Sequence, residues 1–282
     1  MKKILLILLM ALGLVACNGT NEEQKEDLTE TKQEESENKE EGEDKDSGSG
    51  EGKEVYISAA ASLQDALNEI VENYKKDNNV DFKLNYGGSG ALQTQIEEGA
   101  EADIFFSAAQ KQMTALIEGG FVDEGEKEDL LLNDVVLIAP KGNEKGIESI
   151  EDLGTDKAGL VALGDPASVP VGQYSQEILD FYGFADEVNG KTTYGSDVRQ
   201  VLNWVATGEV DAGFVYRTDA MTEEDNVKII EPAPKDSHKP VVYPLAPLKD
   251  SKNREAALDF IAYLKSHQAM EVFEKYGFGK AD

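Results

Sequence analysis

The sequence is poor in the residues on which catalytic and metal sites are commonly built. Its 282 residues include one cysteine, Cys17, and two histidines, His238 and His267. A single cysteine excludes an intramolecular disulfide, and the histidine and cysteine spacing of a metal site is absent. A hydrolase needs a nucleophile beside a base, and both histidines are expected on the surface rather than in a triad. We therefore predict that the protein is not an enzyme and carries no cofactor.

Basic residues are also scarce, and this bears on the choice of partner. The chain has 27 lysines and arginines against 56 aspartates and glutamates, which gives a net charge of −29 at pH 7. This excess of negative charge argues against binding to nucleic acid, because phosphates attract cations. It also argues against electrostatic adhesion to anionic lipid.

The N-terminus has the pattern of a targeting segment. Two lysines precede an apolar run at residues 4–14, which is too short for a comfortable membrane span. The next residues complete the sequence Leu-Val-Ala-Cys, which resembles the lipobox of bacterial lipoproteins. The resemblance implies a signal peptide at residues 1–16 and a diacylglycerol on the sulfur of Cys17. Because two acyl chains anchor a protein stably, we expect it on the outer face of the cytoplasmic membrane.

The segment that follows is of a different kind. Residues 18–53 consist mainly of Glu, Asp, Lys, Ser, Gly and Asn, and Leu28 is their only large apolar residue. Such a segment cannot bury enough surface to offset chain entropy, so we expect disorder. Its acidic residues outnumber its lysines and should extend it by repulsion. We predict that residues 17–53 are a tether; an acidic interaction tail is the sharper alternative, which no feature supports.

Residues 54–282 have the pattern of an α/β protein. They are long enough for one large core or two lobes, and strand-like and helix-like segments alternate throughout, which favours a largely parallel sheet. An apolar run at 130–139, broken only at Asn133 and Asp134, has the length of a strand that passes between lobes. No apolar run in this part is long enough to span a bilayer. The other expected strands are 54–58, 80–86, 102–107, 160–164, 212–216, 227–230 and 241–245.

Several positions where a strand or loop leads into a helix suit an anion. Ser62, for example, follows the first expected strand at the position of a helix N-cap. Helix N-termini present free N–H groups and the positive end of a dipole, and ligands of doubly wound sheets lie beyond the carboxyl ends of strands. Each position alone is best read as an ordinary cap or turn; together they could bind a small dianion without a cationic side chain. They are Ser62, Ser89, Ala108, Val171 and Val198.

Sequence motifs along the whole globular part carry a family resemblance. Seven short motifs, given at the end of this paragraph in chain order, resemble those of the molybdate-binding proteins of bacterial ABC importers. The resemblance implies two α/β lobes, each a mainly parallel sheet flanked by helices, joined by crossing strands and closing on one tetrahedral oxyanion. We expect one lobe at 54–135 and 241–282, and the other at 136–240. The motifs are AAASL (59–63), ADIFFSA (102–108), GDPASVPVG (164–172), DVR (197–199), GFVY (213–216), DSHK (236–239) and KYGF (275–278).

The resemblance also implies which residues bind the anion. Ser62 and Ser89 would each give a hydroxyl, with help from backbone N–H groups. Val171 and Val198 would give backbone N–H groups, and Tyr216 would give its phenol O–H.

Three positions need a comment. Ala108 matches a further backbone donor of the family. The turn around Ser89 reads Gly-Gly-Ser-Gly, where serines are commoner in the family, and Val171 replaces a smaller residue. A backbone donor survives a change of side chain, although Val171 could narrow the pocket.

The resulting prediction is a monomeric, lipid-anchored receptor that delivers molybdate, and also tungstate, to the permease of an ABC importer. Molybdate at neutral pH is a fully deprotonated dianion that only accepts hydrogen bonds, so N–H and O–H donors satisfy it. The alternatives are a receptor for sulfate or another oxyanion, an enzyme acting on a phosphorylated metabolite, and a purely structural surface protein. The enzyme would need a base in the cleft, for which the sequence offers no candidate.

Overall fold

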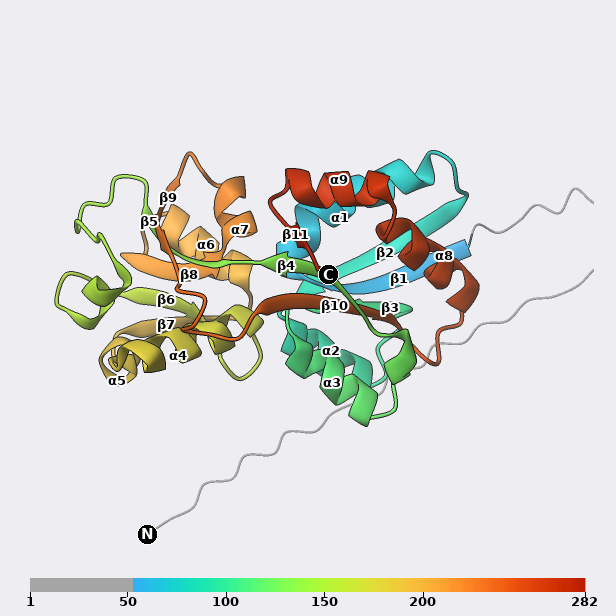
Figure 1. The fold of residues 1–282 in the computed structure, drawn as a ribbon, viewed down its shortest axis with the longest axis horizontal. Coiled ribbons are helices and arrows are strands. Elements are labelled where there is room, and N and C mark those ends of the chain that lie inside the picture. The colour runs from blue at the N-terminus through green and yellow to red at the C-terminus, as the bar shows by residue number, and fades with distance from the viewer. Residues whose placement is uncertain (1–52, 282) are drawn as a thin grey trace, which may run out of the picture. The chain divides into compact units, whose positions relative to one another are not determined.

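The computed structural model describes residues 53–281 (Figure 1). The predictions of a signal peptide, of a lipidated Cys17 and of a tether fall outside these residues, apart from Lys53, which begins the first strand. Within the described range, no helix has both the length and the apolar character needed to cross a membrane.

The first lobe is built on a six-stranded sheet of order β11-β4-β10-β3-β1-β2. Strand β1 is parallel to β2 and β3, whereas β10 is antiparallel to β3 and β4. In Figure 1, α1, α8 and α9 lie on one face of this sheet, and α2 and α3 lie on the other. The elements are β1 (Lys53–Ala60), α1 (Gln64–Lys75), β2 (Val80–Gly87), α2 (Ser89–Glu97), β3 (Ile104–Phe106), α3 (Gln110–Glu118), β4 (Glu128–Asn133), β10 (Val241–Pro247), α8 (Arg254–Leu264), α9 (His267–Lys275) and β11 (Gly279–Lys280).

The second lobe is built on a five-stranded sheet of order β7-β6-β8-β5-β9. Strand β6 is parallel to β7 and β8, whereas β5 is antiparallel to β8 and β9. The elements are β5 (Val135–Pro140), β6 (Val161–Gly164), α4 (Pro170–Tyr182), α5 (Ala185–Asn189), β7 (Thr192–Gly195), α6 (Val198–Ala206), β8 (Ala212–Tyr216), α7 (Arg217–Thr222) and β9 (Val227–Pro232). Short 3-10 turns lie at Ala61–Leu63, Glu124–Glu126 and Ile150–Gly154.

The chain passes between the two sheets twice. It first crosses from β4 to β5, where only Asp134 separates the strands, and it returns from β9 to β10. The predicted α/β fold of two lobes with crossing strands is therefore confirmed. The sheets are mixed rather than mainly parallel, because β5 and β10, the strands that follow the two crossings, run antiparallel to their neighbours. Val135 already pairs with Tyr216 in the second sheet.

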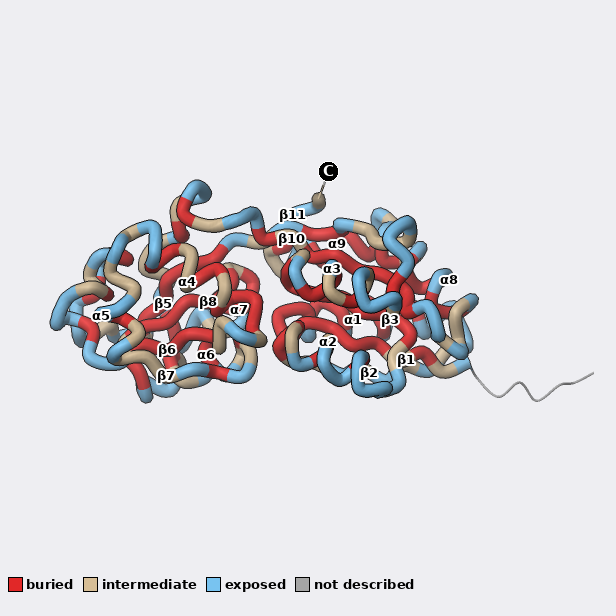
Figure 2. The backbone as a smooth tube through the Cα atoms, turned by 90° about the horizontal axis from the view of Figure 1, so that it is seen from below, coloured by how far each residue is buried: buried red, intermediate tan, exposed pale blue. Residues whose placement is uncertain are grey.

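The inner strands of both sheets are buried between helices, as the red tube along β3, β5, β6 and β8 in Figure 2 shows. Successive side chains of a strand point to opposite faces, so the fully buried Phe105 and Phe106 of β3 fill two different clusters. Phe105 packs with Leu92 and Met113 of α2 and α3, and Phe106 belongs to the larger core cluster. With both faces covered, polar chemistry is left to the strand ends.

Candidate functional site

The carboxyl ends of the parallel strands from both lobes meet at one small cavity. Residues that follow β1, β2 and β3 line it from one side, and residues that follow β6 and β7 or end β8 line it from the other. Its free volume, as space for the centre of a water-sized sphere, is ≈ 10 Å³. This is the room needed by about one water molecule, so the lobes are closed on each other. All five predicted binding residues line it: Ser62, Ser89, Val171, Val198 and Tyr216.

Ser62 lies in a 3-10 turn, Ala61–Leu63, that separates β1 from α1. The prediction that it caps the helix is wrong, because Leu63 occupies the N-cap position of α1 and Ser62 makes no cap bond. The additional turn moves the serine away from the helix start. Its Oγ instead lies 2.9 Å from the phenol oxygen of Tyr243, and the side chain is buried at the cavity wall.

Ser89 is the first residue of α2 and is 1% exposed. Its Oγ accepts a hydrogen bond of 3.0 Å from the backbone N–H of Ala108. This bond occupies the N–H of Ala108, which the sequence had suggested as a further donor to the ligand. Because Ser89 acts as the acceptor there, the hydrogen of its own hydroxyl remains free for a ligand.

Val171 and Val198 lie at helix starts that face the cavity. Val171 is the second residue of α4, after Pro170, and Val198 is the first residue of α6. First-turn N–H groups have no partner within their own helix, and the helix dipole favours negative charge at this end. Both valine side chains are buried, so these positions offer the cavity backbone donors and apolar walls.

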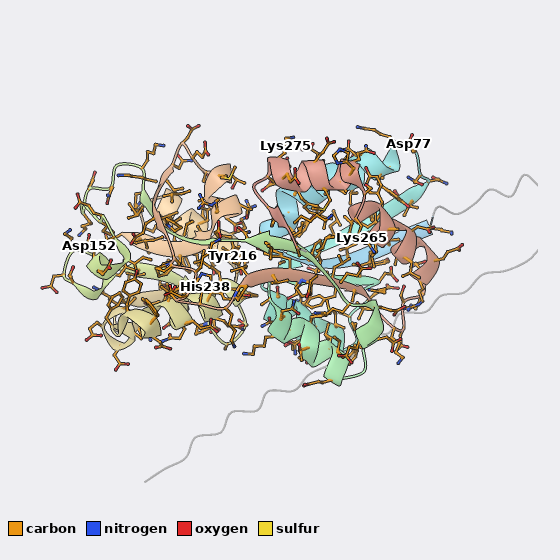
Figure 3. The ribbon with its side chains drawn as sticks, in the orientation of Figure 1. Asp77, Asp152, Tyr216, His238, Lys265 and Lys275 are labelled. Atoms are coloured by element: carbon orange, nitrogen blue, oxygen red, sulfur yellow. The ribbon has the colours of Figure 1, made fainter. Side chains whose placement is uncertain are left out.

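Tyr216 ends β8 and carries the most informative atom of the cavity. Its side chain is 1% exposed, and its phenol oxygen has no hydrogen-bond partner among the described residues. Burial raises the pKa of Tyr216 well above its ordinary value, so the phenol keeps its hydrogen at neutral pH. Figure 3 places Tyr216 on the side of its lobe that faces the other lobe. A buried hydroxyl without a partner is unfavourable and points to a ligand that would accept its hydrogen.

Among the described residues, no carboxylate lines the cavity, and the aspartates that precede α4 and α6 are bound locally. Asp165 accepts a bond of 2.9 Å from the N–H of Ala167. Asp197 caps α6, and its carboxylate accepts a bond of 3.0 Å from the N–H of Gln200. The cavity wall therefore combines neutral N–H and O–H donors with apolar groups.

Arg199, which follows the lining residue Val198, is also bound by carboxylates. Arg199 Nη2 lies 2.6 Å from Asp65 Oδ2 on α1, which joins the two lobes. Its Nε lies 2.6 Å from Oδ1 of Asp219, a residue with no exposed surface. Desolvation raises the pKa of Asp219 to about 7, against the opposing effect of Arg199. Arg199 thus joins the lobes and is not part of the cavity wall.

Two glycines of the first lobe allow the close approach of the second. The N–H of Gly90 donates to the carbonyl oxygen of Ser168 at 2.8 Å. A Cβ on Gly90 would lie 2.5 Å from that oxygen, and a Cβ on Gly88 would lie 2.6 Å from the carbonyl oxygen of Ser196. Because real Cβ atoms do not approach backbone so closely, any larger residue at either position would force the lobes apart.

Other candidate chemistry is not assembled in the part of the chain that the structure describes. His238 contacts the carbonyl oxygen of Lys239 at 2.7 Å, and the exposed His267 lies 3.4 Å from Glu271. Neither histidine lines the cavity, and residues 53–281 hold no cluster of three or more histidine, cysteine, aspartate or glutamate side chains suited to a metal. A larger groove of ≈ 940 Å³ between α3 and α4 contains none of the predicted residues.

The comparison with known proteins agrees with this geometry. The sequence model of the bacterial extracellular solute-binding proteins matches residues 55–279. This chain belongs to that family.

Individual relatives make the assignment more specific. The chain is 48% identical to a putative ABC transporter substrate-binding lipoprotein of Bacillus subtilis, over 79% of this chain and 85% of the relative. It is 39% identical to the molybdate-binding protein ModA of Haemophilus influenzae, over 80% of this chain and 89% of the relative. The solved substrate-binding domain of a putative molybdenum ABC transporter from Clostridium difficile is 41% identical, with a TM-score of 0.63 over 81% of this chain and 99% of that chain. The resemblance read from the motifs is confirmed.

Two residues behind the cavity wall were missed by the sequence reading. Tyr243 on β10 touches Ser62, and Asn133 at the end of β4 lies 3.2 Å from the phenol oxygen of Tyr243. Tyr243 falls in an expected strand, where an aromatic residue is an ordinary core residue. In the sequence, Asn133 is marked only as a polar break in the apolar run at 130–139. Neither carries a local signal that links it to Ser62.

Proposed function

We propose that this solute-binding protein is the molybdate receptor of an ABC importer, and that tungstate is bound in the same site. The proposed ligands are the hydroxyls of Ser62, Ser89 and Tyr216 and the backbone N–H groups of Val171 and Val198. The names of the Haemophilus influenzae relative and of the Clostridium difficile structure support molybdenum as the cargo.

The observation that carries the proposal is the unpartnered phenol hydroxyl of Tyr216 in the small cavity between the lobes. It shares this cavity with Ser89, whose hydroxyl hydrogen is also free, and with two helix starts that present N–H groups. A tetrahedral oxyanion without a proton would accept all these hydrogens. Hydrogen bonds to an ionised acceptor are about twice as strong as neutral ones, which offsets the desolvation of the dianion.

The division of the donors between the lobes supports a closing mechanism. Ser62 and Ser89 belong to the first lobe, and the other three positions belong to the second. An anion held by both sets stabilises the closed arrangement in which Arg199 meets Asp65. Lobe closure would thus report an occupied receptor to a permease, to which the protein would deliver the ion.

The location proposed for the receptor follows from its first residues. The Leu-Val-Ala-Cys sequence favours a diacylglycerol on Cys17, and the Bacillus subtilis relative is named a lipoprotein. A Cys17→Ala variant should therefore lose its lipid and leave the membrane fraction or remain uncleaved. Unchanged membrane partition of a cleaved variant, after fractionation without detergent, would exclude this anchor.

Calorimetry on the purified protein tests the proposed ligand. We expect molybdate and tungstate to bind with saturable heat at one ion per chain, and to raise the melting temperature. At a ligand concentration about a thousandfold above Kd, the stabilisation should reach about 4 kcal/mol. If sulfate binds more tightly than molybdate, the protein is a sulfate receptor. Conversion of a phosphorylated metabolite without saturable oxyanion binding would favour the enzyme.

A further inference from the structure

The hydroxyl of Ser62 can serve the site as a hydrogen-bond donor or as an acceptor, and its bond to Tyr243 decides which. Its Oγ lies 2.9 Å from the phenol oxygen of Tyr243, and either atom could donate the hydrogen. If Ser62 donates to Tyr243, it presents a lone pair to the cavity. If Tyr243 donates to Ser62, the hydrogen of Ser62 is free for the ligand. The direction of this one bond decides whether Ser62 is an acceptor or a donor in the site.

The side chain of Asn133 settles the direction. Its Oδ1 accepts a bond of 2.9 Å from the N–H of Asp134, so the two ends of the amide cannot be exchanged. The amide nitrogen therefore faces the other way, where it donates to Thr218 Oγ1 at 2.9 Å and to the phenol oxygen of Tyr243 at 3.2 Å. Asn133 is a donor toward Tyr243 and cannot accept its hydrogen.

The hydrogen of Tyr243 is then left with one acceptor. Among residues 53–281, Ser62 and Asn133 are the side chains that bond to this phenol oxygen. Tyr243 has no exposed surface, and burial raises its pKa well above the ordinary value, so it keeps its hydrogen at neutral pH. A buried hydroxyl hydrogen without an acceptor is strongly unfavourable, so Tyr243 donates to Ser62.

We propose that Asn133 and Tyr243 are positioning residues that fix the hydroxyl of Ser62 as a donor to the bound oxyanion and thereby exclude anions that carry a proton. This inference rests on the proposed function. The hydrogen bonds all point in one direction: the Asn133 amide donates to Tyr243, Tyr243 donates to Ser62, and Ser62 donates to the anion. We call these three residues the relay. Bonds aligned in this way polarise one another, which strengthens the last donor. Hydrogen phosphate would bring its proton against another hydrogen and leave it unpaired.

The relay also connects the site to the first crossing between the lobes. Asn133 ends β4 immediately before that crossing, and Thr218, which accepts its second hydrogen, lies on α7 of the second lobe. Ser62 and Tyr243 belong to the first lobe. The orientation of a first-lobe donor is thus fixed through a residue that both lobes hold.

Two substitutions read out the relay at pH 8. Tyr243→Phe removes the hydroxyl but keeps the ring that packs against Tyr216 and Phe278. Because Ser62 then loses its fixed direction, we expect molybdate to bind about tenfold more weakly, the worth of one ordinary hydrogen bond. Asn133→Asp replaces the amide donor with an acceptor of the same shape, so Tyr243 would donate to it and Ser62 would donate to Tyr243. We expect about a hundredfold weaker molybdate binding, since a lone pair then faces the dianion.

The double variant with Asn133→Asp and Tyr243→Phe separates the effect of hydrogen-bond direction from the effect of charge. A carboxylate at position 133 repels the dianion in any background, but it reverses Ser62 only when the Tyr243 hydroxyl is present. We therefore expect Asn133→Asp to weaken binding much less in the Tyr243→Phe background than in the wild type. We also expect the single Asn133→Asp variant to raise the affinity for phosphate relative to molybdate. Tyr86→Phe is the matched control, because its hydroxyl bonds to Asn68 outside the cavity.

The outcomes distinguish this inference from the proposed function. If wild-type protein binds molybdate tightly and Tyr243→Phe binds it equally well, the relay is wrong and the function stands. An equal effect of Asn133→Asp in both backgrounds would show charge repulsion alone and would also overturn the relay. If the wild type binds no oxyanion, both proposals fail. Melting curves of each variant check folding, and Tyr243→Phe alone decides the case if Asn133→Asp does not fold.

Discussion

Two polar clusters lie between the lobes, and they differ in whether their buried polar groups have partners within the protein. In the cavity, neutral donors from both lobes face a common space, and the hydroxyl of Tyr216 has no protein partner. In the neighbouring cluster, a single cation, Arg199, is held between two carboxylates, Asp65 and Asp219, so its charge is neutralised within the protein. The charged side chains therefore have oppositely charged neighbours within the protein, whereas the hydroxyl of Tyr216 has no partner among the described residues.

This difference explains why Arg199, although it is next to Val198, is not a proposed ligand of the anion. A free guanidinium in the cavity would attract any anion of suitable size, whatever its protonation state. Binding Arg199 to two carboxylates removes this unselective attraction and uses the charge to hold the lobes together. Selection among anions is then left to hydrogen bonds, which distinguish a lone pair from a proton.

The largest expected effect comes from breaking the charged cluster. Arg199→Gln leaves the buried Asp219 without its cation, and removal of one partner of a buried ion pair costs about 3–5 kcal/mol of stability. Denaturant unfolding at pH 8, where Asp219 of the wild type is mostly ionised, measures this loss. Adding Asp219→Asn to Arg199→Gln should restore much of the stability. A single variant as stable as the wild type would show that the cluster contributes nothing to folding.

The cavity should behave in the opposite way when a donor is removed. Tyr216→Phe deletes a hydroxyl that lacks a protein partner, so the stability of the empty protein should stay equal or rise. Binding of molybdate should weaken by about 1.5–3 kcal/mol, roughly ten- to 150-fold, because a bond to a charged acceptor is lost. Ser62→Ala and Ser89→Ala should weaken binding to a similar degree. Wild-type affinity in a folded variant would remove that residue from the site.

A third variant tests the closed arrangement without touching a donor. Gly90→Ala places a Cβ against the carbonyl oxygen of Ser168. Overpacking of this kind typically costs about 1–3 kcal/mol, and here it falls on the closed form alone, so molybdate affinity should decrease about five- to 150-fold. The melting temperature of the empty protein serves as the control and should change little. Unchanged affinity would mean that binding does not need this approach of the lobes.

The charged cluster should also give the stability a pH dependence. The folded pKa of Asp219, about 7, lies above its ordinary value of 3.8, so the folded state holds a proton that the unfolded chain has lost. This residue therefore makes the free energy of unfolding fall as the pH rises from about 4 to about 7, by at most about 1.4 kcal/mol per pH unit. The difference between wild type and Asp219→Asn isolates this contribution. A difference that is flat or rises over this interval would contradict it.

The sequence predicted those parts of the fold that local patterns determine. The short apolar run at residues 212–216 predicted β8 with its observed bounds, whereas β7 at Thr192–Gly195 was missed because its half-exposed Thr-Thr-Tyr-Gly sequence has no apolar run. Ser62 was placed at a helix cap because no local pattern distinguishes a 3-10 turn from the first turn of an α-helix. Four of the five residues at the cavity were suggested by their positions at helix starts, and the family resemblance assigned their roles and added Tyr216.

The residues behind the cavity wall, Tyr243 and Asn133, could not be found in this way. Ser62 and Tyr243 are 181 residues apart in the chain, and Tyr243 and Asn133 are 110 residues apart. Their contacts exist only once β4 and β10 pair in the first sheet, and nothing in a local window of sequence anticipates that pairing. The role of Arg199 between Asp65 and Asp219 has the same origin, because it depends on how α6 meets α1.

Competition at neutral pH tests most directly whether hydrogen bonds, and not charge, select the anion. Protein loaded with molybdate is titrated with tungstate, sulfate and phosphate, and the release of molybdate is measured. We predict that tungstate displaces it at comparable concentration, that sulfate does so only in large excess because it is smaller, and that phosphate does not displace it measurably. Displacement by phosphate at comparable concentration would contradict the account, because it would show that an acceptor such as Asp165 or Asp197 enters the site.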